Sequence, residues 1–470
     1  MTIRHALLLV CAAGPLGAQA SRTALARSTF AITHVAVIPM TSDTVLRDAT
    51  VLVRDGRIAA VGAVRVPNGT TIIDGRGKYL LPGFADMHAH LYADDSAPDS
   101  LAPYELGVYL ANGVTAARLM IGTPRQLVLR KAVEAGRVVG PQLWSASPQF
   151  TGKPDVNASV VTTPDEARAA VRSAVDAGYD FIKLTIDITP AVFEAVMDEA
   201  ARRRIRVVGH VDPRVGVPRT LEAGQASIEH LDNYMETVLA DSAPSRVSVS
   251  DRNVFRLQNW ESIDYIDDRK VDRIAGATAR AHTWTTPTLA LFKLSFGTRL
   301  TDDEVRARPD WNVIPPNFRA LYVRGRERYW TNPASEDRRQ RWMQVRNHLV
   351  KAIHDSGGKI LAGSDAPEWL LTYGWTLHRE LEALVAAGLT PYDALLAATR
   401  NPAEFLGATR EWGTIERGKR ADLVLVDANP LDDIRNTTRI AGVSVGGRWL
   451  EPGELQRMVR IATDKLALVP

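Results

Sequence analysis

The feature that most limits how this chain can fold is an alternation of short apolar segments and amphipathic stretches between residues 80 and 407. Most of the apolar segments are short enough for buried strands and are followed by a helical pattern of apolar residues. There are eight of them: GFADMH, GVTAARLM, PQLWSAS, DFIKLT, IRVVGH, QASIEH, TWTTPTL and KILAGSD. Eight alternating units favour a closed parallel (β/α)8 barrel of the TIM type, an α/β fold, over an open sheet.

Several of the expected helices begin with the same pair of residue types. A threonine before a helix accepts a hydrogen bond from a free backbone amide, and a proline fits the first helical position. The sequence offers Thr163-Pro164 with Glu166, Thr189-Pro190, and Thr390-Pro391 with Asp393. The first of these helices is expected to stop at Gly178, because glycine adopts the left-handed conformation that ends many helices.

The two ends of the chain differ from this pattern, since they carry β-branched runs separated by turns. Residues 28–79 include ATVLVRDGRIAAVG, in which Asp55-Gly56 is typical of a hairpin turn. Residues 408–452 include KRADLVLVDANP and RIAGVSVGGRWL, which have the same composition. We expect one small β-sandwich module built from both chain ends, followed by a tail over 453–470.

Polar side chains that can bind a metal stand at the ends of several predicted strands. The chain has ten histidines, and four of them end predicted strands. The carboxyl ends of barrel strands meet at one rim, where such barrels carry their active sites. His88 and His90 also alternate, so both can face the same side of an extended strand. The strand-end set is His88, His90, Lys183, His210, His230 and Asp365.

The first 20 residues have the composition of a secretory signal peptide. Arg4 precedes an apolar core, and Ala18-Gln19-Ala20 is a small-residue cleavage signal. A frayed amphipathic N-terminus is the alternative. Cleavage would remove Cys11, the single cysteine of the chain. We therefore expect an exported protein, periplasmic or extracellular, whose metal ligands come from His, Asp, Glu or Lys.

Charge and hydropathy argue against two classes of partner. The net charge of +3 comes without a basic run that is interleaved with aromatic residues, so we expect no nucleic acid. After the first 20 residues no apolar stretch is long enough to cross a bilayer, so we expect no membrane partner. We expect a small-molecule substrate and a homo-oligomer.

These motifs together resemble the metal-dependent amidohydrolase superfamily, most closely its imidazolonepropionase-like and prolidase-like (Xaa-Pro dipeptidase) members. The resemblance rests on LPGFADMHAH, FIKLT, GHVD, SIEHLDNY, AGSDAP and GTIERGKRADLVLVD, and it spans nearly the whole chain after residue 20. It implies a hydrolase that cleaves an amide-type C–N bond, such as that of a dipeptide or an N-acyl amino acid. It also implies two divalent metal ions, with zinc expected and manganese, iron or cobalt as alternatives.

The resemblance also implies a role for each ligand. His88, His90 and Asp365 would hold one metal ion, and His210 and His230 the other. Lys183 would carry a carbamate that bridges both ions, because burial favours its neutral amine. The alternative is an unmodified Lys183 that pairs with Asp365 in an enzyme with one metal ion.

In the implied mechanism a hydroxide that bridges the metal ions attacks the carbonyl, and Asp365 acts as general acid and base. Lys183 belongs to the catalytic set through its carbamate. Tyr234 would bind the substrate carbonyl or the oxyanion, with a plain loop tyrosine as the alternative. Arg118 would grip a substrate carboxylate, with a salt bridge at the rim as the alternative. Asp86 is expected to orient the first strand end.

Two questions stay open at the level of sequence. An insertion over about 236–345 carries five of the ten tryptophans and could shape the substrate pocket or form an added helical layer. The same site could hydrolyse another cyclic amide, an ester or a lactone. A catalytically silent binding protein of this fold is an alternative of another class, which the complete ligand set disfavours.

The signal-peptide hypothesis predicts a mature chain that begins near Ser21, because the small-residue site ends at Ala20. N-terminal sequencing of protein recovered from the periplasm or the medium checks this. Recovery of intact protein that starts at Met1 in the cytoplasm would contradict it.

Overall fold

The computed structural model describes residues 29–91, 101–155, 157–244, 247, 257–297, 300–320, 322–323, 336–367 and 370–468. The expected signal peptide, residues 1–20, lies outside this part of the chain. Within the described residues, no helix is both long enough and apolar enough to span a bilayer.

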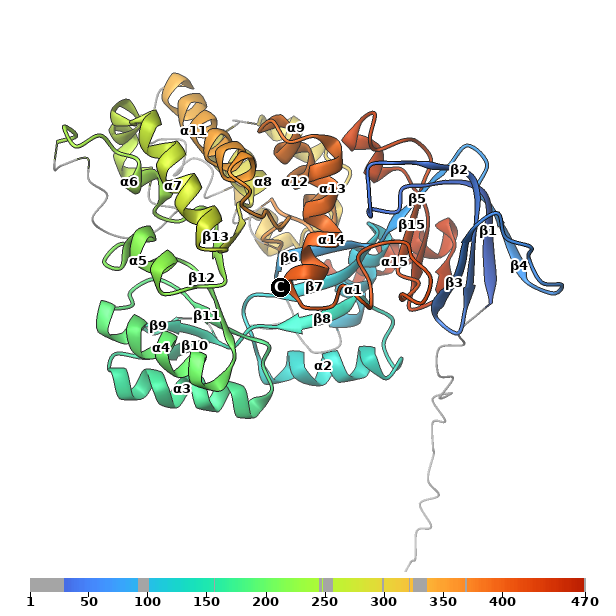
Figure 1. The fold of residues 1–470 in the computed structure, drawn as a ribbon, viewed down its shortest axis with the longest axis horizontal. Helices are drawn as coiled ribbons and strands as arrows, with labels where there is room; N and C mark the ends of the chain where they lie inside the picture. The colour runs from blue at the N-terminus through green and yellow to red at the C-terminus, as the bar shows by residue number, and fades with distance from the viewer. Residues whose placement is uncertain are drawn as a thin grey trace, which may run out of the picture.

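Strands from both ends of the chain form one sheet, as the sequence pattern led us to expect. The sheet runs in the order β17-β16-β15-β5-β1-β2-β3, and β4 pairs with β1. Figure 1 shows β1, β2 and β3 beside β15 at one side of the molecule, although they come from opposite ends of the chain. The strands are β1 (Phe30–Val37), β2 (Leu46–Arg54), β3 (Arg57–Gly62), β4 (Thr71–Asp74), β5 (Tyr79–Pro82), β15 (Leu423–Val426), β16 (Ile440–Val445) and β17 (Arg448–Leu450).

This terminal sheet curls so that one edge meets the chain just before β15. The amide of Ile58 in β3 donates to the carbonyl of Lys419 at 2.9 Å, and the amide of Ala421 donates to Gly56 at 2.9 Å. The Phe30 and Trp449 rings lie 5.8 Å apart across the curl. The curl encloses an apolar cluster of its own. The expected two-layered sandwich stays a prediction.

The rest of the chain has parallel sheets flanked by helices. One sheet has the order β6-β7-β8 and the other β10-β9-β11-β12-β13-β14. Two of these strands, β9 and β10, were not expected from the sequence, and each has three residues. The strands are β6 (Phe84–Ala89), β7 (Val114–Leu119), β8 (Gln142–Ser145), β9 (Gln149–Thr151), β10 (Ala158–Val160), β11 (Phe181–Leu184), β12 (Arg206–Gly209), β13 (Ser227–Glu229) and β14 (Trp284–Thr286).

Single parallel bridges connect these sheets to each other and to the segment 359–366. The bridges are Ala146 with Phe181, Thr285 with Ile360, and Ala366 with Ala89. Seven of the eight segments expected to be strands contain one, and the eighth is joined to β14 and β6 by these bridges. An α/β fold with parallel pairing is therefore confirmed.

Helices follow most of these strands, and the three Thr-Pro starts lie where the sequence placed them. Thr163, Thr189 and Thr390 each accept a backbone amide at the start of α3, α4 and α13. Gly178 ends α3 with a φ of 89°. The α-helices are α1 (Ala102–Ala111), α2 (Pro124–Glu134), α3 (Pro164–Ala177), α4 (Pro190–Arg203), α5 (Gly216–Glu222), α6 (Tyr234–Thr237), α7 (Asp268–Arg280), α8 (Leu289–Phe292), α9 (Asp302–Arg306), α11 (Glu336–Asp355), α12 (Trp375–Ala386), α13 (Pro391–Ala398), α14 (Arg400–Phe405) and α15 (Pro452–Leu466).

The C-terminal residues expected to form a tail instead form most of α15. Its Leu455, Ala462 and Leu466 are buried, and the helix packs against α1. Short helical turns complete the described elements: η3 (Leu257–Tyr265), η4 (Lys293–Gly297), η5 (Trp311–Val313) and η6 (Ile434–Thr438).

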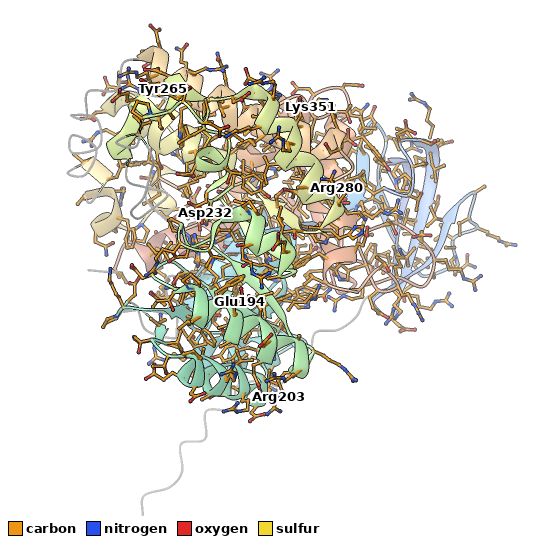
Figure 2. The ribbon with its side chains drawn as sticks, turned by 60° about the vertical axis from the view of Figure 1, so that its left-hand side comes forward. Glu194, Arg203, Asp232, Tyr265, Arg280 and Lys351 are labelled. Atoms are coloured by element: carbon orange, nitrogen blue, oxygen red, sulfur yellow. The ribbon has the colours of Figure 1, made fainter. Side chains whose placement is uncertain are left out.

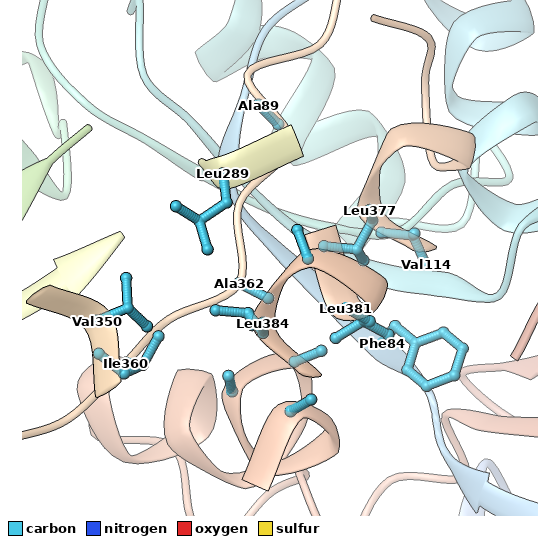
Figure 3. Packing of buried hydrophobic residues seen from close by; sticks show 14 of the residues in the cluster. Phe84, Ala89, Val114, Leu289, Val350, Ile360, Ala362, Leu377, Leu381 and Leu384 are labelled. Carbon is cyan, nitrogen blue, oxygen red and sulfur yellow. The ribbon is translucent and has the colours of Figure 1, made fainter. Parts of the chain in front are cut away.

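The largest apolar cluster packs helices against the start of β6 and β7. In Figure 3, Leu377 and Leu381 of α12 lie near Phe84 of β6, and Leu384 lies beside Ala362. Leu289 of α8 belongs to the same cluster, as does Val350 of α11. This cluster holds α8, α11 and α12 to the strands whose ends carry the metal-ligand candidates.

Removing the cap of α3 is expected to weaken the fold by a small, measurable amount. Thr163 and Glu166 form a reciprocal capping box, in which each side chain accepts from the backbone amide of the other residue. Thr163→Ala should lower the free energy of unfolding by about 1 kcal/mol, because one helical amide loses its acceptor. Urea unfolding followed by circular dichroism measures this, and Thr163→Ser serves as the control that keeps the hydroxyl. Equal midpoints for the alanine and serine variants would contradict the assigned role.

Candidate metal centre

The structure brings the six strand-end residues into one region. His88 lies in β6 and Lys183 in β11, while His210 and His230 directly follow β12 and β13. The His88 and His230 ring centroids are 4.5 Å apart, and those of His210 and His230 are 4.9 Å apart. His88 and His90 are separated by 5.3 Å. Residues that are far apart in sequence therefore form one nest of imidazoles.

Asp365 closes this nest from the segment 359–366. His88, His230 and Asp365 each offer one possible ligand atom, and these three atoms all lie within 4.8 Å of one another. Asp365 Oδ1 lies 2.9 Å from His90 Nε2 and 3.2 Å from His88 Nε2. Burial raises the pKa of Asp365 to about 7, although the cationic neighbour Lys183 opposes this. The carboxyl group can thus gain or lose a proton near neutral pH.

Oxygen acceptors orient three of the histidine rings through Nδ1. A ring that donates its Nδ1 proton keeps the lone pair on Nε2 for a metal ion. Burial also holds the pKa of His88 and His230 well below the usual value, so their rings are neutral. The pairs are His88 with Glu229 at 2.9 Å, His210 with Asp232 at 2.6 Å and His230 with Thr288 at 2.8 Å.

The Thr288 hydroxyl fixes the direction of its bond with His230. Its single proton is donated to the carbonyl of Pro287 at 2.9 Å. The same oxygen must therefore accept from His230 Nδ1. The Nε2 atom of His230 is left without a proton, as metal ligation requires.

The side-chain amine of Lys183 is buried and has no hydrogen-bond partner in the described part of the chain. The residue is 1% exposed. Burial lowers the pKa of Lys183 to about 8. Its backbone amide is fixed by Ser147 Oγ at 3.0 Å. A buried polar atom without a partner is costly, which indicates that a further group belongs here.

Asp86 orients the first strand end, as expected. Its carboxylate accepts the Ser364 amide at 2.9 Å and the Ser364 hydroxyl at 2.5 Å. It also accepts the His88 amide at 3.3 Å. Asp86 thereby joins the end of β6 to the residue that precedes Asp365.

The expectation that Arg118 grips a substrate carboxylate is not met. Its side chain is fully buried, and Nη2 lies 2.9 Å from both carboxylate oxygens of Glu229. Nη1 donates to Ser227 Oγ at 3.0 Å, and Nε donates to the Met87 carbonyl at 2.5 Å. The guanidinium is thus fully engaged with groups inside the protein. The salt-bridge alternative describes it better.

The expectation that Tyr234 touches the substrate is also not met. Tyr234 is fully buried at the start of α6, and its hydroxyl is hydrogen-bonded to Thr278 Oγ1 of α7 at 2.8 Å. Burial raises the pKa of Tyr234 above the usual value. The ring belongs to the large apolar cluster, so its role is packing.

Sequence reasoning missed the three acceptors that orient the rings. Glu229 and Asp232 flank His230 in SIEHLDNY, and Thr288 follows β14. A carboxylate within two residues of a strand-end histidine was an available signal. Which ring each acceptor would meet depends on neighbouring strands, so spacing alone could not assign the pairs. In Figure 2, Asp232 lies between the part of the molecule that holds Glu194 and the part that holds Arg280 and Lys351.

A parallel α/β fold with buried histidines and an aspartate at its strand ends is the arrangement of a metal-binding barrel-type enzyme site. Residues 79–450 match the Amidohydrolase family, and the chain belongs to that family. It is 24% identical to an ochratoxinase of Aspergillus niger over 452 residues, covering 83% of this chain and 79% of the relative. It is 29% identical over 241 residues to an imidazolonepropionase of Mycolicibacterium smegmatis, covering 43% of this chain and 61% of that protein.

A solved structure from Bifidobacterium longum, assigned as a prolidase, has a similar fold. It superposes with a TM-score of 0.68 at 25% identity, covering 93% of this chain and 99% of the other. The likenesses to imidazolonepropionases and to prolidases both agree with the resemblance found in the sequence.

The residues present fit a divalent metal ion. Unprotonated imidazole nitrogens and a carboxylate are the ligands that zinc and related ions prefer in proteins. His88, His230 and Asp365 offer such atoms close together, and the orphaned Lys183 amine interacts electrostatically with the carboxylate of Asp365. His90 and His210 keep side chains that are 15% and 16% exposed, so the nest opens to solvent beside them.

The buried Arg118–Glu229 pair predicts a stability effect rather than a substrate effect. Arg118→Met should lower the free energy of unfolding by about 3–5 kcal/mol, because Glu229 would be left as a buried charge without its cation. Urea unfolding checks this, with Arg118→Met/Glu229→Gln as the matched variant that should recover part of the loss. A stable Arg118→Met protein with only a raised KM would instead support a substrate contact.

Proposed function

We propose that this protein is a metal-dependent hydrolase that cleaves an amide-type C–N bond in a small substrate. Prolidase-like dipeptides and N-acyl amino acids are the substrate classes we favour. The observation that carries this proposal is the buried set of His88, His230 and Asp365 beside the orphaned Lys183 amine. The likeness to a prolidase structure supports the choice of substrate class.

The proposed cofactor is a pair of divalent ions, with zinc first and manganese, iron or cobalt as alternatives. His88, His90 and Asp365 would hold one ion, and His210 and His230 the other. When bound, the ions would supply a hydroxide nucleophile at neutral pH and polarise the scissile carbonyl. Lys183 would carry a carbamate whose oxygens reach both ions. Burial lowers the pKa of its amine to about 8, so more of the amine is neutral near pH 7 than in an exposed lysine, and the neutral form can take up carbon dioxide.

The chain's own groups account for the proton transfers. Asp365 Oδ1 faces His90 and His88, and its pKa of about 7 suits both acceptance and return of a proton. We assign it the role of general base toward water and general acid toward the leaving nitrogen. The acceptors on Nδ1 orient the imidazole rings of His88, His210 and His230. The substrate would approach beside His90 and His210, where the nest opens to solvent.

We also propose the finer features of the fold and of its setting. The parallel bridges between the two sheets and the segment 359–366 support one closed (β/α)8 barrel. The curl of the terminal sheet supports a small β-sandwich module built from both chain ends. The cleavage signal before Ser21 supports an exported protein. A homo-oligomer and the absence of nucleic-acid and membrane partners remain proposals.

One observation favours a second candidate reaction. The similarity to an imidazolonepropionase supports hydrolysis of an imidazolone-type ring by the same groups. Such a substrate would need the same neutral imidazoles and the same proton transfers at Asp365. The two candidates differ in substrate shape and not in chemistry.

A substrate and metal experiment tests the proposed function. We expect the purified protein to hydrolyse members of a library of dipeptides and N-acyl amino acids, and to hold close to two metal ions per chain. Dialysis against a chelator should abolish the activity, and added zinc should restore it. Liquid chromatography with metal analysis measures both. Full activity after complete metal removal would contradict the proposal, and full activity with one tightly bound ion would contradict its two-metal form.

Lys183 gives a sharper test of the carbamate. Lys183→Ala should lose most of the metal and nearly all activity, because each ion loses an oxygen ligand. Acetate or propionate should restore some of both by filling the vacated space. Lys153→Ala is the matched control, since Lys153 is 57% exposed and pairs with Asp187. A Lys183→Ala protein with normal metal content and a merely shifted acid limb of its pH profile would show that Lys183 does not bridge the ions.

A further inference from the structure

Arg346 reaches from helix α11 to the backbone of a metal-ligand candidate. It is 2% exposed, and its Nη2 donates a hydrogen bond to the carbonyl oxygen of His230. The two residues are 116 positions apart in sequence. Arg346 lies in α11, directly after the insertion over about 236–345. The described contacts give this arginine a direct link to the nest of histidines.

The backbone at His230 has a shape that needs such a link. His230, Leu231 and Asn233 have φ values of 61°, 53° and 60°, in the left-handed region that side chains disfavour. Such residues keep this conformation only where their surroundings hold them in it. The His230 amide is held by the carbonyl of Thr286 at 2.8 Å, and its carbonyl is held by Arg346. These two hydrogen bonds together fix the peptide groups on both sides of His230.

The guanidinium of Arg346 is itself held by aromatic rings. Its Cζ lies 3.5 Å from the centroid of Phe292 and 4.8 Å from that of Trp342. Stacking of this kind orients a guanidinium plane without neutralising its charge. Within the described part of the chain, Arg346 forms no ion pair within 4 Å. The position of the guanidinium is therefore set by the hydrogen bond to His230 and by the aromatic rings, and not by a salt bridge.

The segment around α8, which supplies Phe292, also holds the imidazole ring of His230. Phe292 ends α8, and Thr288 immediately before α8 accepts from His230 Nδ1. Glu380 of α12 accepts the amide of Ala290 at 2.7 Å and so anchors α8. The apolar cluster in Figure 3 includes residues of α8, α11 and α12. The His230 ring and the His230 carbonyl are therefore set by one packed body.

We propose that Arg346 is a positioning residue that holds His230 in the conformation required for metal binding. This inference rests on the proposed metal-dependent function. Arg346 acts through the peptide backbone, and α8 supplies both the ring that stacks on Arg346 and the hydroxyl that orients the imidazole. Without Arg346 the turn 230–233 would relax from its left-handed conformation, and Nε2 of His230 would no longer point reliably at the ion.

The test measures metal affinity as well as activity. Arg346→Met removes the donor and keeps a long apolar side chain. Arg346→Gln is a second loss variant, too short to reach the carbonyl, in case the methionine variant does not fold. Arg346→Lys restores a cationic donor. Arg341→Met is the matched control on the same helix, because Arg341 is 44% exposed and faces Asp268 at 3.6 Å.

The dissociation constants for zinc and cobalt are measured by competition with a chelator, together with the absorption spectrum of the bound cobalt. We expect about 10–100-fold weaker metal binding and an altered cobalt spectrum for the methionine and glutamine variants, as for other groups that orient ligands. The lysine variant should recover much of the affinity, and Arg341→Met should match the wild type. Urea unfolding of the metal-free proteins runs in parallel, because a merely structural arginine would alter the unfolding midpoint alone.

Two outcomes separate this inference from the proposed function. If the wild type binds metal and a folded loss variant binds it equally well, the positioning role of Arg346 is wrong and the proposed function stands. If the wild type binds no divalent metal under any loading condition, the proposed function itself is wrong.

Discussion

The buried carboxylate of Glu229 is the contact on which the arrangement of this site depends. It accepts from Arg118 on one side and from His88 Nδ1 at 2.9 Å on the other. All three side chains are at most 1% exposed, so none can turn to water for a substitute partner. Glu229 thereby links the buried Arg118 to the orientation of the His88 ring, which is a candidate metal ligand.

The other histidines are oriented on the same principle but by different elements. His210 depends on Asp232, two residues beyond His230, and His230 depends on Thr288 after β14. Each ring thus takes its direction from a neighbouring strand end rather than from its own. Movement of any one strand would disturb the ligand beside it, which explains why the helices that pack these strands matter for the site. The Arg346 contact extends this dependence to α11.

Burial also sets the chemistry that the site can perform. It raises the pKa of Asp365 to about 7 and lowers that of Lys183 to about 8. A carboxyl group and an amine that both change protonation near neutral pH are suited to proton transfer and to carbamate formation. The same residues on an exposed rim would be a fixed anion and a fixed cation. The low-dielectric setting is therefore part of the function that we propose.

The sequence by itself determined the parallel α/β alternation, the Thr-Pro starts of α3, α4 and α13, and the six residues at strand ends. These features depend on local backbone geometry and on the period of the apolar pattern, which one segment can specify alone. Only the tertiary structure decided that Arg118 and Tyr234 are buried away from substrate. It alone also paired Glu229 with His88 and Arg346 with His230, over separations of 141 and 116 residues. Such contacts depend on how distant segments pack, and spacing along the chain carries no information about that.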